Sequence, residues 1–142
     1  MHRARHVLTS GLALALALAV SISGACDTRI QSVPQLEPQV VNLRNSFNFQ
    51  AVNLVGVFDD VTFRWQIDGT TATVVQTPAA LLGAATVFVN DSRGVQVYQR
   101  SLTENGSFTT QAGVPGTWTI RLHFADASGN IAVQLAKQDS LP

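Results

Sequence analysis

The fold is decided by a stretch in which apolar and polar residues alternate, Thr117-Trp118-Thr119-Ile120-Arg121-Leu122-His123-Phe124. Bulky apolar side chains occupy every second position, so they share one face of an extended chain. This alternation is typical of a strand in an antiparallel sheet that has one face on a core and the other in water.

The same period of two recurs on both sides of this stretch. Residues 47–51 and 62–67 alternate in the same way, and the apolar residues of 131–135 continue the pattern. Residues typical of turns lie between these runs, as Asp68-Gly69, Asn105-Gly106 and the segments 90–94 and 126–130. Short strands separated by regular turn signals indicate a sandwich or a barrel.

Two segments decide how many strands the chain has. We expect residues 126–130, Asp-Ala-Ser-Gly-Asn, to close the last hairpin, and residues 77–85 to form a helical turn or a crossover. With these assignments the sequence predicts an all-β fold, an antiparallel β-sandwich of about eight strands with jelly-roll or Ig-like topology.

One part of the chain resembles a known type of hairpin. Gly113-Val114-Pro115-Gly116-Thr117-Trp118-Thr119-Ile120, with the later Gly129 and residues 131–135, is similar to the closing hairpin of jelly-roll and Ig-like accessory domains. Convertase P-domains and the Golgi-dynamics type of β-sandwich have comparable hairpins. The resemblance implies a sandwich with a binding or stabilising role, and it carries over no catalytic residue.

The first 25 residues have the pattern of a signal peptide. Arg3 and Arg5 lie in a positively charged start, residues 7–20 are apolar, and residues 22–25 are mostly small. The apolar run is shorter than the ~20 residues that a membrane-spanning helix needs. We therefore expect residues 1–25 to direct export.

The end of this leader predicts a lipid anchor. Ser23-Gly24-Ala25-Cys26 resembles the bacterial lipobox, although Ser23 stands where leucine is most usual. The resemblance implies that the thiol of Cys26 receives diacylglycerol, that acyl chains such as palmitate hold the chain on a membrane, and that cleavage precedes Cys26. An ordinary signal peptide cut near Ala25 and an uncleaved anchor are the alternatives. The predicted location is the bacterial cell envelope, at the outer membrane or the periplasmic face of the inner membrane.

The segment after the anchor reads as a spacer. Residues 26–43 contain Pro34 and Pro38 and show no period, which is typical of a semi-rigid tether. Val40 and Val41 are an alternative first edge strand. We assign residues 26–43 to a lipid-anchored tether and residues 44–142 to the sandwich.

Charge and cysteine content exclude several classes of protein. From Asp27 onward seven basic side chains face nine acidic ones, and Lys137 is the only lysine. A nucleic-acid-binding protein would need a basic stripe, and none occurs. Cys26 is the only cysteine, so the exported domain has no internal disulfide or zinc knuckle. We expect no cofactor.

The side chains beyond the leader form no recognisable catalytic motif, and we therefore predict that the protein is not an enzyme. His123 is the only histidine beyond the leader, and it falls on the outward face of its strand near Arg121. No Gly-x-Ser-x-Gly elbow is present. We interpret His123 as a solvated surface residue.

Three aspartates are candidates for a metal site. Asp59, Asp60 and Asp126 lie where we expect loops, and carboxylates from adjacent loops are ligands that Ca²⁺ prefers. The alternative is that each bonds to nearby backbone, as aspartates in turns usually do.

Most aromatic residues are in phase with valine, isoleucine and leucine, so the pattern places them in the core. Phe58 and Tyr98 are the exceptions, and the pattern leaves both for the surface. Together these observations predict a lipid-anchored, non-catalytic binding or interaction module with an envelope protein or a glycan as partner. The alternatives are a small or calcium-dependent envelope enzyme that uses the loop aspartates, and a structural envelope spacer.

Overall fold

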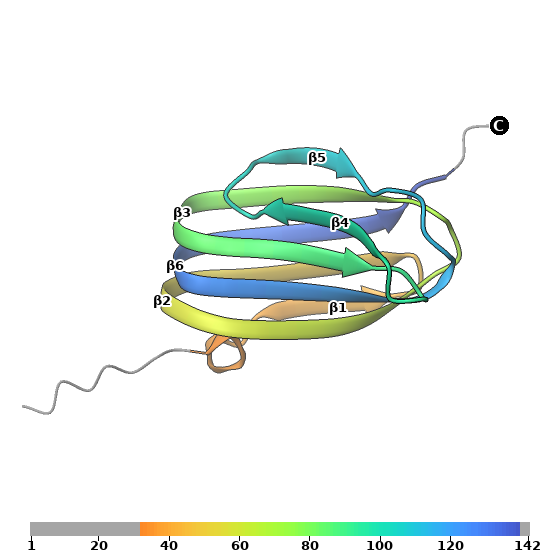
Figure 1. Ribbon diagram of the computed structural model, residues 1–142. Helices are drawn as coiled ribbons and strands as arrows, with labels where there is room; N and C mark the ends of the chain where they lie inside the picture. The colour runs from red at the N-terminus through yellow and green to blue at the C-terminus, as the bar shows by residue number, and fades with distance from the viewer. Residues whose placement is uncertain (1–31, 140–142) are drawn as a thin grey trace, which may run out of the picture.

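A computed structural model describes residues 32–139 of the protein. These form a 3-10 helix and six strands: η1 (Val33–Leu36), β1 (Gln39–Leu43), β2 (Ser46–Ile67), β3 (Ala72–Asn90), β4 (Gln96–Ser101), β5 (Gly106–Thr109) and β6 (Gly116–Lys137). The strands make one sheet in the order β1-β2-β6-β3-β4, with β5 on β3, and every pairing is antiparallel (Figure 1). The expected all-β antiparallel fold is confirmed. No helix in this part of the chain is long and apolar enough to cross a membrane.

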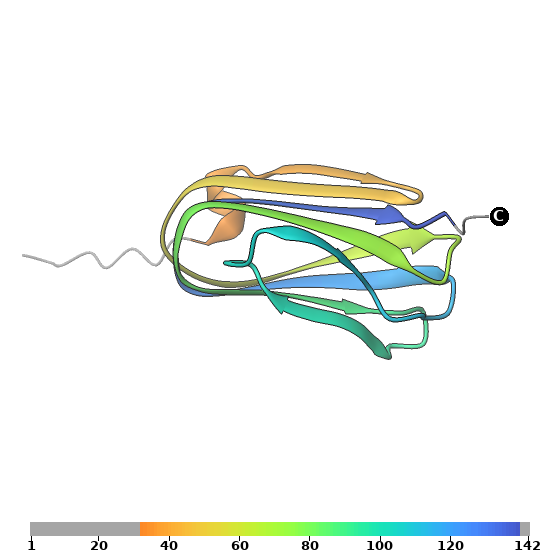
Figure 2. The same ribbon diagram turned by 90° about the horizontal axis from the view of Figure 1, so that it is seen from above.

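The single sheet folds over on itself to make the sandwich. Strands β2 and β6 have 22 residues each and β3 has 19, and each runs through one layer, bends, and returns through the other (Figure 2). The first layer contains β1, the starts of β2 and β3, the end of β6, and β5. The second layer contains the end of β2, the start of β6, the end of β3, and β4. We call the side with the three bends (residues 52–58, 79–84 and 125–130) the bent end, and the side with the connecting loops (44–45, 68–71, 91–95 and 110–115) the open end.

β-Bulges produce the bends. The pairing of β2 with β6 shifts register three times between Ala51 and Asp59, and the pairing of β3 with β6 shifts twice between Ala79 and Ala84. An extra residue at a bulge kinks its strand and increases the local twist. The residues at the bends with positive φ are Asn53, Gly56, Ala80, Gly83, Asp126 and Gly129.

Side chains of β6 complete the bend of β2. The hydroxyl of Ser128 accepts a hydrogen bond from the backbone N–H of Gly56 at 2.8 Å. The amide oxygen of Asn130 accepts one from the N–H of Asn53 at 2.7 Å. These bonds occupy backbone donors that the bulges remove from the regular ladder.

The bends explain why the structure has six strands and the sequence predicts about eight. Residues 126–130 do not close a hairpin, because they are the bend inside β6. Residues 77–85 are neither helical turn nor crossover, because they are the bend inside β3. Residues that tolerate positive φ serve a bulge as well as a turn. The hairpin resemblance around residues 113–135 therefore does not extend to the strand connections.

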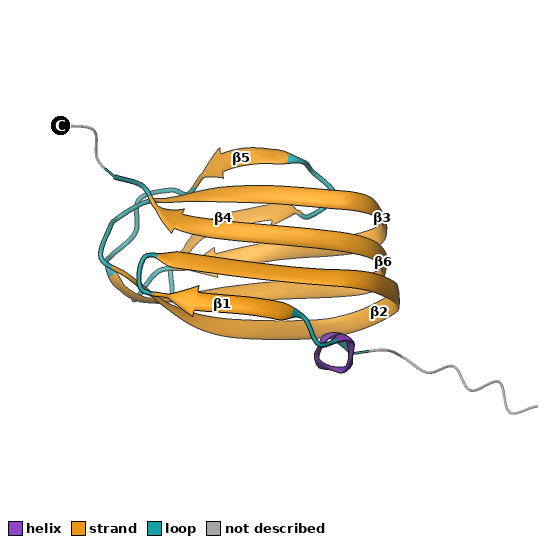
Figure 3. Cartoon of the chain, turned by 180° about the vertical axis from the view of Figure 1, so that it is seen from behind, coloured by secondary structure: helices purple, strands orange, loops and turns teal. Residues whose placement is uncertain are grey.

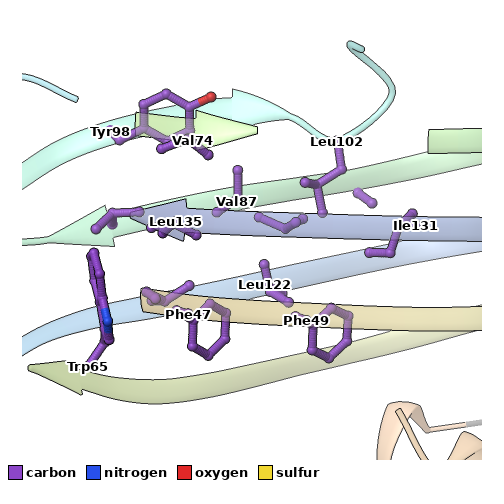
Figure 4. Packing of buried hydrophobic residues seen from close by; sticks show 14 of the residues in the cluster. Phe47, Phe49, Trp65, Val74, Val87, Tyr98, Leu102, Leu122, Ile131 and Leu135 are labelled. Carbon is purple, nitrogen blue, oxygen red and sulfur yellow. The ribbon is translucent and has the colours of Figure 1, made fainter. Parts of the chain in front are cut away.

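Alternating residues of both layers fill the core, as the period of two predicts. Trp65 and Trp118 are register partners on β2 and β6, and their rings meet edge to face with centroids 6.1 Å apart. Both indole N–H groups donate to backbone oxygens, Trp65 to Leu43 at 3.0 Å and Trp118 to Val114 at 2.7 Å. Phe47, Phe49 and Trp65 project from β2 into the space between the layers (Figure 4).

Tyr98 is buried, so the expectation that it lies on the surface is wrong, whereas Phe58 is exposed as expected. The β3–β4 pairing shifts register after the pair Val89 and Tyr98, which breaks the alternation of β4. The Tyr98 hydroxyl donates to the side-chain oxygen of Gln76 at 2.8 Å, and burial raises the pKa of Tyr98 to about 12. The Gln76 amide is itself buried and donates to the backbone oxygens of Ser101 and Glu104.

The folded domain begins earlier than residue 44, the expected end of the tether. Val33 of η1 belongs to the core, and its N–H donates to Oδ2 of Asp59 at 2.8 Å. Gln39–Leu43 pairs with β2 as an edge strand, as in the alternative reading of Val40 and Val41. Pro34 lies in the first turn of the 3-10 helix, which begins at Val33, instead of extending a spacer.

Candidate functional site

The residue with the clearest expected chemistry, Cys26, lies outside the described residues, as does the whole leader of residues 1–25. The lipid anchor and the export signal therefore stay predictions.

Asp59 and Asp60 are both engaged with other protein groups. The carboxylate of Asp59 accepts the N–H of Val33 and, through its other oxygen, the N–H of Asp60 at 2.8 Å. It therefore holds η1 against the start of the second layer. Asp60 is exposed and lies 3.1 Å from Nδ1 of His123 and 3.6 Å from the guanidinium of Arg121.

Asp126 is exposed in the bend of β6, at φ 56°. Within residues 32–139 no three His, Cys, Asp or Glu side chains lie close enough together to hold a metal ion. The structure thus brings Asp60 together with Arg121 and His123, and it does not gather Asp59, Asp60 and Asp126 into one site.

The second layer has a shallow depression on its outer face. It has a volume of about 200 Å³ and opens to solvent. Four neighbouring strand segments line it with hydroxyl, amide, guanidinium and aromatic groups, from Thr62, Phe88, Asn90, Gln96, Thr119 and Arg121. We call this surface the polar face.

Arg121 organises the polar face. Its guanidinium carbon lies 4.2 Å from the centre of the Phe88 ring, which is cation–π contact. The same guanidinium lies 3.6 Å from Oδ1 of Asp60 on β2, the neighbour of β6 on the side opposite β3. A planar cation held between a ring and a carboxylate has fewer orientations to lose when it binds a ligand.

Nothing on the polar face forms a nucleophile–base pair. Among residues 32–139 His123 is the only histidine, and its one side-chain hydrogen bond goes to Asp60 and not to a hydroxyl. Acyl-transfer chemistry needs a nucleophile within hydrogen-bond reach of its base. The groups present are suited to binding a polar ligand.

The alternation predicts part of this site. It places Arg121 and His123 on the outward face, where both are found. Phe88 is not among the aromatic residues that the sequence analysis leaves for the surface, yet it lies outward between the buried Val87 and Val89 and lines the depression. The alternation of residues 87–89 is the signal that could have predicted this position. No protein-family model matches the chain, and no curated protein matches it either.

Proposed function

We propose that this chain is a lipid-anchored protein of the bacterial cell envelope, and that its sandwich is a non-catalytic module that binds a glycan through the polar face. The anchor is supported by residues 1–25 and by Ser23-Gly24-Ala25-Cys26, in which the thiol is the chain's only one. The anchor places the domain at the outer membrane or at the periplasmic face of the inner membrane.

The depression on the polar face is the observation that carries the binding role. Side chains of Thr62, Asn90, Gln96 and Thr119 supply donors and acceptors in one shallow surface, with the Phe88 ring at its side. Sugars offer hydroxyls for such groups and C–H faces for an aromatic ring. Arg121 adds one cation that can bind a carboxylate or an acetamido oxygen.

The polar face is better suited to a glycan ligand than to a protein partner. Hot spots are desolvated pockets rich in large apolar or aromatic anchors. The polar face has one aromatic ring, and its other lining groups are hydrophilic. Nucleic acid is excluded by the acidic balance of the exported chain.

The anchor is tested by Cys26→Ala in cells. We expect the variant to leave the membrane fraction or to accumulate unprocessed, because the acyl chains supply the attachment. A variant that is processed normally and stays with the membranes would show that the anchor is elsewhere.

Binding is tested with residues 27–142, produced without the leader and the lipid site, and soluble glycan probes, namely muropeptides and chito-oligosaccharides. We expect amide NMR shifts in β2, β3 and β6 around the depression, and a loss of affinity of about tenfold or more in Arg121→Ala, the cost of one charge-assisted contact. Gln134→Ala, an exposed residue on β6 in the other layer, is the matched control and should bind as the parent does. Equal affinities for the two variants, or no shifts with either probe, would contradict the glycan role.

A further inference from the structure

The bent end carries a cluster of exposed apolar side chains. Val52, Val55 and Phe58 on β2 are between 46% and 64% exposed, and Leu82 on β3 is 70% exposed. We call these four residues the bend patch. Exposed alanines at positions 79, 80 and 84 lie along the same bend of β3.

The bulges are what turn these residues outward. In the bend of β2, Leu54 and Val57 are buried, and the residues beside them face solvent. Outward positions in the straight part of the same strand are polar, as Thr62, Arg64 and Gln66. An outward row that changes from polar to apolar at the bend marks an interaction surface.

The neighbouring strand β6 adds three polar side chains to this end, those of Asp126, Ser128 and Asn130. The side chains of Ser128 and Asn130 lie on β6 between the two halves of the bend patch, and both accept hydrogen bonds from bend N–H groups. In residues 52–58, 79–84 and 125–130, Asp126 is the one charged side chain. The surface therefore has no basic group to attract anionic lipid or an acidic partner.

The first described residues, Ser32 and η1, also lie at the bent end (Figure 1). η1 lies beside the bends (Figures 1 and 3), and the Val33 N–H is bonded to Asp59, directly after the bend of β2. Six residue steps separate Cys26 from Ser32, which span at most about 20 Å. A lipid on Cys26 therefore keeps the bent end within about 20 Å of the bilayer surface. The open end lies roughly 30 Å further along the strands.

We propose that the bend patch docks on the surface of the lipid bilayer to which the chain is anchored. The inference rests on the proposed anchor at Cys26. A short tether gives the patch an effective concentration in the millimolar range at the bilayer, so even weak apolar contact is populated. In this orientation the long strands point away from the bilayer, and the polar face remains exposed to solvent on the side of the domain.

The test uses the lipid-modified full mature chain, reconstituted in phosphatidylcholine vesicles that contain a doxyl-labelled lipid quencher. Cys26 is the only native cysteine and its thiol is blocked by the lipid, so Leu82→Cys and Arg93→Cys each accept one fluorophore. We expect strong quenching of the label at position 82, at the bent end, and only background quenching at position 93, at the open end.

Charge variants with matched exposure sharpen the test. Val55 and Val95 are 64% and 59% exposed, at the bent and open ends respectively. Val55→Glu should abolish the quenching at position 82, and Val95→Glu should leave it unchanged. Since the bend patch has no basic side chain, the quenching should not fall when salt is raised.

Each failure has a distinct signature. If the mature chain does not float with the vesicles, the anchor is wrong and the docking falls with it. If the chain floats and the label at position 82 is unquenched, the anchor stands and the docking is overturned. If fluorescence at position 82 instead depends on protein density and not on the quencher lipid, a second copy covers the bend patch, which also overturns the proposal.

Discussion

The two ends of the sandwich are built in different ways. At the bent end three strands turn through bulges, and the close approach of their backbones leaves no room for side chains at Gly83 and Gly129. At the open end separate loops are joined by polar side chains, above all Asp91. The first end depends on backbone conformation and the second on hydrogen bonds to a carboxylate, so the two ends should fail under different changes.

The largest expected effect is the loss of a bend glycine. Gly83 has φ +77°, and a Cβ there would lie 1.9 Å from the backbone oxygen of Asp126. Gly83→Ala should lower the free energy of unfolding by about 4 kcal/mol, because overpacking adds to the left-handed backbone strain. Urea denaturation measures this.

Gly94 at the open end is the matched control. It also has positive φ, at +84°, but a Cβ there meets nothing within 4 Å. Gly94→Ala should cost only about 1 kcal/mol, the conformational strain alone. Equal losses at the two glycines would remove the distinction between the ends.

A smaller effect is expected when β6 loses its contacts to the bend of β2. Ser128→Ala leaves the part-buried N–H of Gly56 without its acceptor and should cost about 1–2 kcal/mol. Asn130→Ala affects an exposed N–H and should cost less than about 1 kcal/mol. Thermal unfolding compares them with Ser107→Ala, an exposed serine on β5. If Ser128→Ala is as mild as that control, the side chain does not stabilise the bend.

The smallest expected effect is a loosening of the open end in acid. Hydrogen bonds from backbone N–H groups, that of Val114 first and those of Val95 and Arg93 after it, hold the pKa of the Asp91 carboxyl below its usual range. A carboxyl whose pKa is lower in the folded state stabilises the fold above its unfolded pKa of 3.8, and this stability is lost as the pH falls through the folded pKa.

The protection of the Val95 and Val114 amides from hydrogen exchange, taken relative to the intrinsic exchange rate at each pH, should therefore fall below pH 4. The protection of the Gly56 amide should fall only at lower pH. In Asp91→Asn the acid dependence of the open end should disappear. Simultaneous opening of both ends on acidification would contradict this assignment.

The alternation in residues 117–124, with the same period in residues 47–51, 62–67 and 131–135 and the turn residues between these runs, predicts the antiparallel sandwich. It also predicts the core positions of Trp65 and Trp118 and the outward positions of Arg121 and His123. It did not predict that β2, β3 and β6 each pass through both layers. Asp-Ala-Ser-Gly-Asn suits a hairpin turn and a bulge equally, and only the register with β2 and β3 decides between them.

The candidate site, like the bends, depends on contacts between strands that a local sequence pattern does not describe. The depression on the polar face joins residues of four strand segments, so no local pattern in the sequence describes it. The sequence pattern predicts a surface position for Tyr98, and this is wrong because a register shift in the pairing of β4 with β3 interrupts the period of two. Asp59 was expected in a loop and proves to be the acceptor for Val33, since the start of the domain is only apparent once η1 is seen against β2.

The central claim is the lipid anchor at Cys26, which would hold the bent end near the bilayer and the open end away from it. It can be tested directly on the mature chain. Trypsin should release residues 26–29 from protein extracted from cell membranes, because Arg29 is the first basic residue after Cys26. Mass spectrometry should find this peptide beginning at Cys26 and carrying a thioether-linked diacylglycerol. An unmodified Cys26, or a peptide that still contains residues of the leader, would contradict the proposed anchor.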